Sequence, residues 1–150
     1  MRIAIASDHA AIDMKTALAD MMREMGHEVD DLGPDDDSSV DYPDYGYKLA
    51  QVMASGKAQR GVALCGSGIG ISIAVNRNPA CRSALVSEVL SATLARSHND
   101  ANVIAMGARL IGIEQAKACI EAFLKTEFLG DRHQRRVDKL SQPPALETAR

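Results

Sequence analysis

The chain of 150 residues contains no tryptophan, and only 3% of its residues are aromatic. Single-stranded nucleic acids stack their bases on aromatic side chains, and a net charge of −3 offers no basic surface to a phosphate backbone. No apolar run approaches the length of about 18 residues that a membrane-spanning helix requires. We therefore expect no nucleic-acid partner and no membrane partner. The absence of a signal-peptide pattern predicts a cytoplasmic protein.

Cysteine is also scarce. Cys65, Cys81 and Cys119 are an odd number without C-x-x-C spacing, so neither a disulfide framework nor a zinc knuckle is indicated. The histidines and carboxylates lack H-x-x-x-H or a comparable ligand spacing. We therefore expect a reducing compartment and a protein with no metal and no other cofactor.

Five short strand-like runs alternate with segments of helical periodicity. The runs cover residues 3–6, 28–32, 61–64, 83–86 and 103–106, and clear helical segments cover 45–55, 89–96 and 113–124. Such alternation predicts right-handed parallel βαβ units. We predict an α/β fold, namely a three-layer Rossmann-like sandwich with a five-stranded parallel sheet. The whole chain, 1–150, reads as a single domain that ends in a charged helix (131–140) and a tail.

One glycine loop lies at the centre of this pattern, in the stretch GVALCGSGIGISIAVN at 61–76. A buried strand ends at Cys65, and Gly66, Gly68 and Gly70 then lead into the apolar start of a helix. Without Cβ atoms, backbone N–H groups can close on an anion at a helix N-terminus. The alternative is a tight strand-to-helix turn that holds a buried, inert cysteine.

Polar residues follow several strands at the edge where a doubly wound sheet binds its ligand. This topology brings together a carboxylate, an imidazole, a thiol and a guanidinium. Taken singly, Asp8 could be a helix cap, His9 a surface residue and Arg109 a solvated cation. Ser87 could cap the helix that follows it. The residues at this edge are Asp8, His9, Cys65, Ser87, Glu88 and Arg109.

Further candidates lie outside that edge. Tyr42 precedes Pro43, and this position favours an extended backbone at Tyr42. The tyrosine either presents its hydroxyl to a pocket or packs within a loop. His98 is either a dipole-stabilised helix C-terminus or a functional group. Arg132 and Arg136 have i, i+4 spacing, which suits either a solvated basic face or a clamp on a phosphate dianion.

These motifs together resemble the type B ribose-5-phosphate isomerases, a family shared with bacterial galactose-6-phosphate isomerase subunits. The segments IAIASDHA, DYPDY, LCGSGIGISIAVN, SHNDANVIAMGAR and GDRHQRRV carry the resemblance over nearly the whole chain. It implies a metal-free aldose–ketose isomerase. It also implies a homodimer, or a tetramer, whose sites lie between subunits.

By position, Cys65 resembles the family's catalytic base, and His98 resembles the group that assists ring opening. One branch of the family uses a glutamate four residues after the cysteine position, where this chain has Ile69. The loop amides would hold the enediolate oxygen, and the arginines would contact mainly phosphate. We predict as substrate-binding residues Asp8, His9, Tyr42, Gly66, Ser67, Gly68, Ile69, Gly70, Asn99, Arg109, Arg132 and Arg136.

The expected reaction interconverts ribose 5-phosphate and ribulose 5-phosphate through an enediolate. Allose 6-phosphate, galactose 6-phosphate and a tetrose phosphate are alternative substrates, and a non-catalytic sugar-phosphate-binding module is an alternative class. A cysteine phosphatase would need an arginine about six residues after the cysteine, where Ile71 stands. A dinucleotide-binding module would need a glycine motif after the first strand, and SDHAAID contains no glycine.

Overall fold

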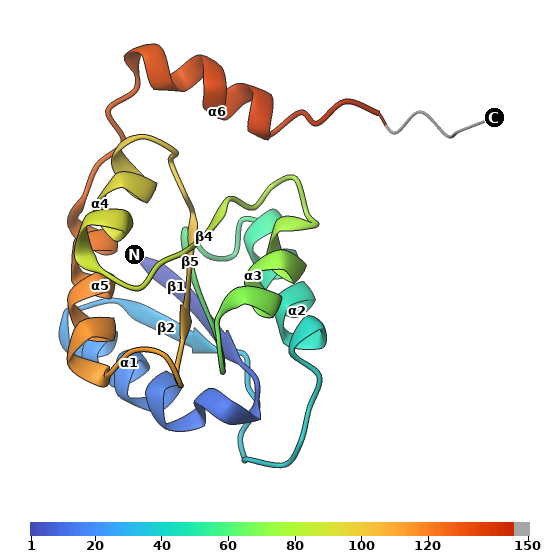
Figure 1. The fold of residues 1–150 in the computed structure, drawn as a ribbon, viewed down its shortest axis with the longest axis vertical. Helices are drawn as coiled ribbons and strands as arrows, with labels where there is room; N and C mark the ends of the chain where they lie inside the picture. The colour runs from blue at the N-terminus through green and yellow to red at the C-terminus, as the bar shows by residue number, and fades with distance from the viewer. Residues whose placement is uncertain (146–150) are drawn as a thin grey trace.

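A computed structural model describes residues 1–145 of the chain. Five parallel strands form one sheet with the order β2-β1-β3-β5-β4. The predicted α/β sandwich with a five-stranded parallel sheet is therefore confirmed (Figure 1). The strands are β1 (Arg2–Ser7), β2 (Glu28–Asp31), β3 (Arg60–Cys65), β4 (Ser83–Leu85) and β5 (Val103–Gly107).

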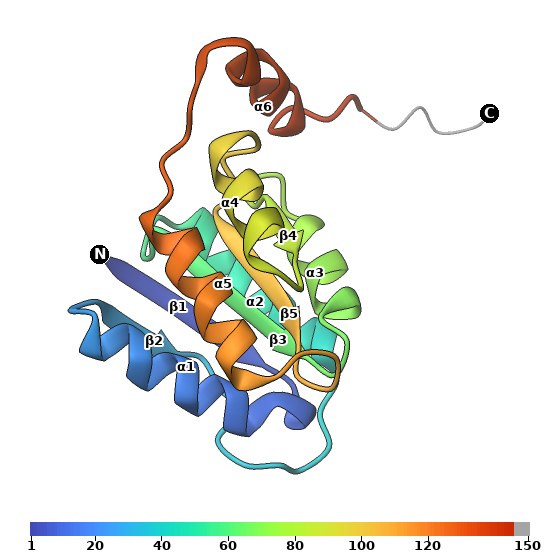
Figure 2. The same ribbon diagram turned by 60° about the vertical axis from the view of Figure 1, so that its left-hand side comes forward.

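Helices cover both faces of the sheet (Figures 1 and 2). One face carries α1 (Ile12–Glu24), α4 (Val89–Ser97) and α5 (Ile113–Lys125), and the other carries α2 (Tyr42–Ala54) and α3 (Ile69–Asn76). A last helix, α6 (Gln134–Leu140), follows a 3₁₀ turn (Asp131–His133) and stands beyond the sandwich at the end of an extended segment. Within residues 1–145, no helix is long and apolar enough to cross a membrane.

The strands alternate large and small side chains between the two faces, as the two-residue period of a strand requires. On β1, Ile3 and Ile5 pack in the cluster with α1, α4 and α5, whereas Ala4 and Ala6 pack in the cluster with α2 and α3. The central strands repeat this division. Val62, Leu64, Ile104 and Met106 face the three-helix layer, and Ala63, Cys65, Val103 and Ala105 face the two-helix layer.

The two-helix layer contains one very close approach. A Cβ atom built on Gly46 of α2 would lie 2.8 Å from the Cβ of Ala74 and 3.1 Å from the carbonyl oxygen of Ile71, both in α3. Since real Cβ atoms do not come this close to another heavy atom, Gly46 sets the spacing of α2 and α3. That spacing fixes where the N-terminus of α3 meets the strand edge.

A buried ion pair closes the end of β2. Lys15 of α1 is 2% exposed, and its Nζ donates to the two carboxylate oxygens of Asp31 at 2.6 and 2.8 Å and to the carbonyl of Pro34 at 2.8 Å. Asp31 also accepts the N–H of Gly33 at 2.9 Å. A buried ammonium group needs such a full set of acceptors, so this clamp fixes the start of the segment that joins β2 to α2. This segment, residues 32–41, contains four aspartates and is called the acidic loop below.

Two local predictions were wrong. Tyr42 is the first residue of α2 and not part of an extended loop, because Pro43 occupies the first turn of a helix, where its missing N–H costs nothing. Glu88, not Ser87, caps α4, and its carboxylate accepts the N–H of Ser91 at 2.9 and 3.0 Å. The Ser91 hydroxyl also donates to this carboxylate, and this bond, followed by the backbone bonds, lowers the pKa of the Glu88 carboxyl.

The predicted helical stretch over 131–140 is confirmed in its bounds, but its first turn is the 3₁₀ turn and only the rest is α6, so Arg132 and Arg136 lie in different elements. The predicted tail begins at Ser141, whose hydroxyl accepts Arg82 Nη1 at 3.3 Å. Its last five residues, 146–150, lie outside the described residues.

The α2–α3 contact generates a prediction with a definite sign. Alanine is favoured over glycine inside a helix by about 1 kcal/mol, but overpacking costs about 1–3 kcal/mol. Because the contact is only 2.8 Å, we expect Gly46→Ala to lower the free energy of unfolding in urea by about 1 kcal/mol. Ala74→Gly removes the nearest atom, so the double variant should lose less stability than the two single losses added together. A more stable Gly46→Ala protein would contradict the close approach.

Candidate active site

Cys65 is the last residue of β3, and its side chain is 4% exposed. Its sulfur accepts a hydrogen bond from the backbone N–H of Gly68 at 3.1 Å. The loop after the strand therefore folds back over the thiol and aims a backbone donor at it.

This loop can close only because Gly68 has no side chain. Gly68 has φ +76 and stands at the N-terminus of α3. A Cβ atom there would lie 2.6 Å from the carbonyl carbon of Met106 and 2.8 Å from Leu85 Cδ1. Both the left-handed backbone and the contact with β5 thus require glycine. The same contact holds the Gly68 N–H against the sulfur.

Tyr42 lies against the same loop from α2. A Cβ atom on Gly70 would lie 2.5 Å from two carbons of the Tyr42 ring, so the ring rests on the first turn of α3. The hydroxyl of Ser67 accepts the N–H of Ile69 at 3.2 Å, and the Ile69 side chain is largely exposed. The other first-turn N–H groups of a helix have no intrahelical partner.

Arg109 reaches the loop from the end of β5. Its backbone N–H donates to the Gly66 carbonyl at 3.0 Å, and the N–H of Ala108 donates to the Cys65 carbonyl at 2.9 Å. The Arg109 Cδ, Nη1 and Nε atoms lie 3.4, 3.5 and 3.7 Å from the place where a Gly66 Cβ would be. A guanidinium group therefore lies beside the glycine loop.

Asp8 and His9 lie at the end of β1, which pairs with β3. The N–H of Asp8 donates to the Leu64 carbonyl at 3.1 Å, and the buried Asp8 carboxylate accepts the N–H of Ala10 at 2.9 Å. His9 Nδ1 lies 3.1 Å from the backbone nitrogen of Val40 and 3.2 Å from its oxygen. Asp8 is thus a cap, as considered above, and His9 joins this edge to the acidic loop.

The other two cysteines lie in different surroundings. Burial raises the pKa of the Cys81 thiol to about 11, and burial together with Glu88 raises the pKa of Cys119. Cys81 Sγ contacts the Ala50 carbonyl at 3.8 Å. Neither environment favours a thiolate.

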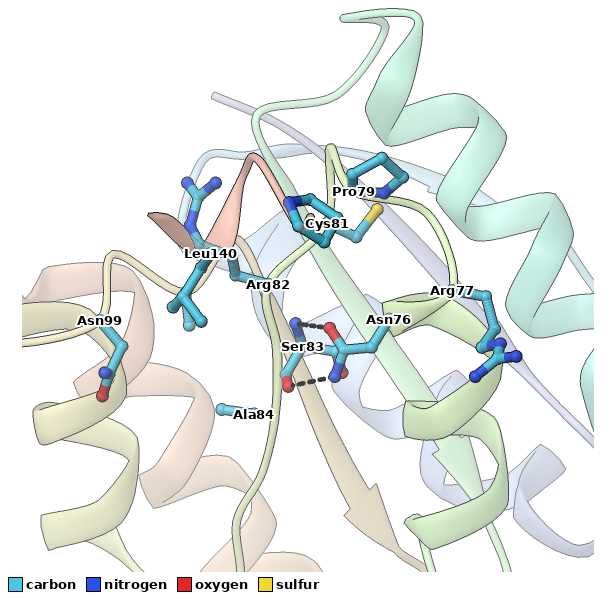
Figure 3. A pocket seen from close by; sticks show the side chains of 11 residues that line it. Asn76, Arg77, Pro79, Cys81, Arg82, Ser83, Ala84, Asn99 and Leu140 are labelled. Atoms are coloured by element: carbon cyan, nitrogen blue, oxygen red, sulfur yellow. Dashed lines mark hydrogen bonds between the residues drawn. The ribbon is translucent and has the colours of Figure 1, made fainter. Parts of the chain in front are cut away.

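The remaining predicted site residues lie at the opposite end of the sheet. His98 ends α4, which runs back from the carboxyl ends of the strands toward their amino ends. Asn99 lines a cavity of 430 Å³ there, together with Arg82, Asn76 and Leu140 (Figure 3). The length of β5 separates this end from Cys65 by about 13 Å along the strand. Within one chain, His98 and Asn99 therefore do not meet the thiol.

An ionic network anchors the turn that carries His98 and Asn99. Asp100 has φ +46, and its carboxylate accepts Arg96 Nη1 at 2.8 Å and Arg82 Nη2 at 3.2 Å. Arg96 is 3% exposed, and its Nη1 also donates to the Ala101 carbonyl at 2.7 Å. Arg82 Nε donates to the Asp100 carbonyl at 2.9 Å. The turn is therefore held from both sides.

The ring of His133 stacks on that of His98, with centroids 4.3 Å apart and an interplanar angle of 13°. Burial lowers the pKa of His133, and the nearby His98, Arg132 and Arg136 lower it further. Both arginines therefore lie around this ring pair. Arg82 and His133 do not stand out in the sequence, because their partners are far away along the chain. The i, i+4 spacing of Arg96 and Asp100 was the one available signal.

The sequence matches a model of the ribose/galactose isomerase family over residues 3–140. Ribose-5-phosphate isomerase B of Escherichia coli is 39% identical over 93% of this chain and 94% of its own length. D-erythrulose-4-phosphate isomerase of Pectobacterium atrosepticum is 42% identical over 93% of both chains.

The fold agrees with a solved structure of the same kind. Ribose-5-phosphate isomerase B of Clostridium thermocellum superposes with a TM-score of 0.93 at 43% identity, covering 95% of this chain and 96% of that one. Sequence and fold therefore both match these proteins over nearly the full length of each chain. The chain therefore belongs to the ribose/galactose isomerase family and is a sugar-phosphate isomerase.

Proposed function

We propose that the protein interconverts ribose 5-phosphate and ribulose 5-phosphate, with Cys65 as the base. The observation that carries this proposal is the 3.1 Å hydrogen bond from the Gly68 N–H to the Cys65 sulfur, in a family of sugar isomerases. An amide at this distance would serve a thiolate well, because charged acceptors form the stronger hydrogen bonds. Burial raises the pKa of the Cys81 and Cys119 thiols, so a thiolate forms less readily at those two positions.

The proposed chemistry begins with opening of the ribose ring. His98 delivers a proton to the ring oxygen, and the anomeric hydroxyl loses its proton as the ring C–O bond breaks. The free aldehyde results. The Cys65 thiolate then removes the C2 proton, and the electron pair moves to O1 to form the enediolate. The O2 proton passes to O1, the thiol returns its proton to C1, and a ketone remains at C2.

Fixed dipoles would stabilise the charge that develops on the enediolate oxygen. Within Gly66–Gly70, the Gly68 N–H already donates to the Cys65 sulfur and the Ile69 N–H to the Ser67 hydroxyl. The N–H groups of Gly66, Ser67 and Gly70 would therefore supply these dipoles at the start of α3, where the positive end of the helix dipole adds to them. Asp8 and Tyr42 would contact sugar hydroxyls at the two walls of the loop. His9 would contact the phosphate, and Arg109 would provide positive charge for it together with Arg132 and Arg136.

The position of His98 and Asn99 supports a site shared between two subunits. These residues lie at the amino ends of the strands, away from the thiol of their own chain. An exposed apolar surface lies beside the Cys65 loop, where Ile69, Ile73 and Leu85 line one groove. Monomers rarely expose such surfaces. A homodimer that covers this surface would bring the second subunit next to Cys65.

Val89, Leu90 and Leu94 of α4, the helix that follows β4, are further exposed apolar side chains. β4 is an edge strand of the sheet, and a two-fold axis beside it would place the same surface on both subunits. We propose that each of two equivalent sites takes Cys65 from one chain and His98, Asn99, Arg132 and Arg136 from the other.

A substrate panel tests the proposed reaction. Turnover is compared across ribose 5-phosphate, allose 6-phosphate, galactose 6-phosphate and erythrose 4-phosphate, and we expect it to be highest with ribose 5-phosphate. A tetrose phosphate is the main alternative, because a relative of 42% identity is named D-erythrulose-4-phosphate isomerase. A kcat/KM that is highest for erythrose 4-phosphate would reject ribose 5-phosphate as the substrate and leave the isomerase class intact.

Replacement of single cysteines tests the base. Cys65→Ala should lower kcat by at least about a hundredfold, because a positioned proton acceptor contributes about 10²–10⁴ to the rate. Because Cys65 is itself buried, the thermal unfolding of this variant is compared with that of Cys81→Ala, which removes a thiol buried to a similar degree. Cys81→Ala and Cys119→Ala serve as controls and should keep their activity, although both remove a buried side chain. Comparable turnover in all three variants would sink the thiolate mechanism.

Mixed dimers test the shared site. Cys65→Ala and His98→Ala proteins, each inactive alone, are unfolded together and refolded. Random pairing makes half of the dimers mixed, and each of these has one intact site, so about a quarter of the wild-type activity should return. Arg136→Ala in place of His98→Ala should give the same recovery. If mixed dimers form but neither mixture regains activity, these groups do not cross the interface.

A further inference from the structure

The stacked pair of His98 and His133 is unusual in its surroundings. His133 is only 8% exposed although it is polar, and its ring lies nearly parallel to that of His98 at a centroid distance of 4.3 Å. The contact joins the end of α4 to the 3₁₀ turn before α6, two segments far apart along the chain. A close, parallel contact restricts the tilt of both rings.

The backbone around His133 is shaped to produce this contact. Gly130 and Asp131 have successive positive φ angles of +68 and +46, which reverse the chain directly before the 3₁₀ turn. The N–H of Leu129 donates to the Ser97 carbonyl at 3.0 Å, so the approaching chain is fixed to the last turn of α4. A left-handed aspartate costs backbone energy and persists only where the surroundings impose it.

The groups around His133 disfavour the charged form of its ring. Burial, the His98 ring and the guanidinium groups of Arg132 and Arg136 all lower the pKa of His133, against a smaller opposite effect of Asp131. His133 is therefore neutral near pH 7. Two parallel imidazolium rings would repel each other, so a neutral His133 is compatible with the close stack.

We propose that His133 is a positioning residue whose flat ring holds the His98 imidazole in the plane from which it transfers protons during ring opening. This inference rests on the proposed function. A small misplacement of a reacting group can cost about a hundredfold in rate, so a ring that fixes His98 has a kinetic effect without touching the substrate. The required property is a flat face and not a titratable nitrogen.

The test compares side chains of different shape at this one position. His133→Phe keeps a flat ring, whereas His133→Leu and His133→Gln do not. Gln134→Leu is the matched control, because Gln134 is the next residue and is exposed, with a bond only to Asp138. The thermal unfolding midpoint and the elution volume of each variant report on folding and assembly.

Two assays separate ring opening from proton abstraction at carbon. Isomerisation of ribose 5-phosphate requires ring opening. Deuterium incorporation at C1 of ribulose 5-phosphate in deuterium oxide does not, because that ketose cannot close a furanose through its phosphorylated oxygen. A loss confined to the first assay therefore reports on His98, whereas general damage to the site would lower both.

We expect His133→Leu and His133→Gln to lower the kcat for ribose 5-phosphate by about tenfold to a hundredfold, with KM and C1 exchange nearly unchanged. His133→Phe should stay within about threefold of the wild type. In a His98→Asn background, His133→Leu should cause no further loss, because both changes remove the same contribution.

Other results would overturn the inference. Wild-type kcat in His133→Leu and His133→Gln would show that the stack has no kinetic role. An equal loss in His133→Phe would show that the imidazole itself is needed, and an equal loss of C1 exchange would show a general structural role. If His98→Asn leaves ribose 5-phosphate isomerisation intact, the proposed role of His98 fails and this inference fails with it.

Discussion

The close approach of the Cys65 loop to β5 is the constraint on which the rest of the site depends. Gly68 packs against the main chain of Met106, and this contact directs its N–H to the Cys65 sulfur. The contact needs a residue with a left-handed backbone and no side chain, and it needs a helix that starts at that point. The spacing of α2 and α3, set at Gly46, supplies the last of these. The packing of α2 against α3 thus helps to set the hydrogen-bond geometry at the Cys65 thiol.

The polarity of a parallel sheet explains why the predicted site residues form two groups. Each strand ends at the edge that holds Cys65, and each returning helix ends at the opposite edge. A residue at the end of a helix such as α4 is therefore kept from the thiol of its own chain. The shared site that we propose would bring the two groups together by taking each group from a different subunit. The second subunit would lie on the apolar surface beside β4.

Much of this could be predicted from the sequence, because short apolar runs and the glycine loop are local signals. The sheet and the place of Cys65 at the end of β3 depend on such signals. Other features could not be predicted. The stack of His98 on His133 depends on a partner that is remote along the chain. The start of α2 at Tyr42 and the cap at Glu88 each depend on a choice between neighbouring residues of similar propensity.

The acidic loop has its two ends fixed independently of its length. Lys15 holds the beginning of the loop at Asp31 and Pro34, and His9 holds its end at Val40. The free energy of closing a loop rises by only about 0.6 kcal/mol for each doubling of its length. Evolution could therefore lengthen or shorten the segment between the two tethers at little cost to the fold. Because the far tether is His9, such changes would alter the room beside the sugar site that we propose, and this would give one scaffold a route to sugars of different chain length.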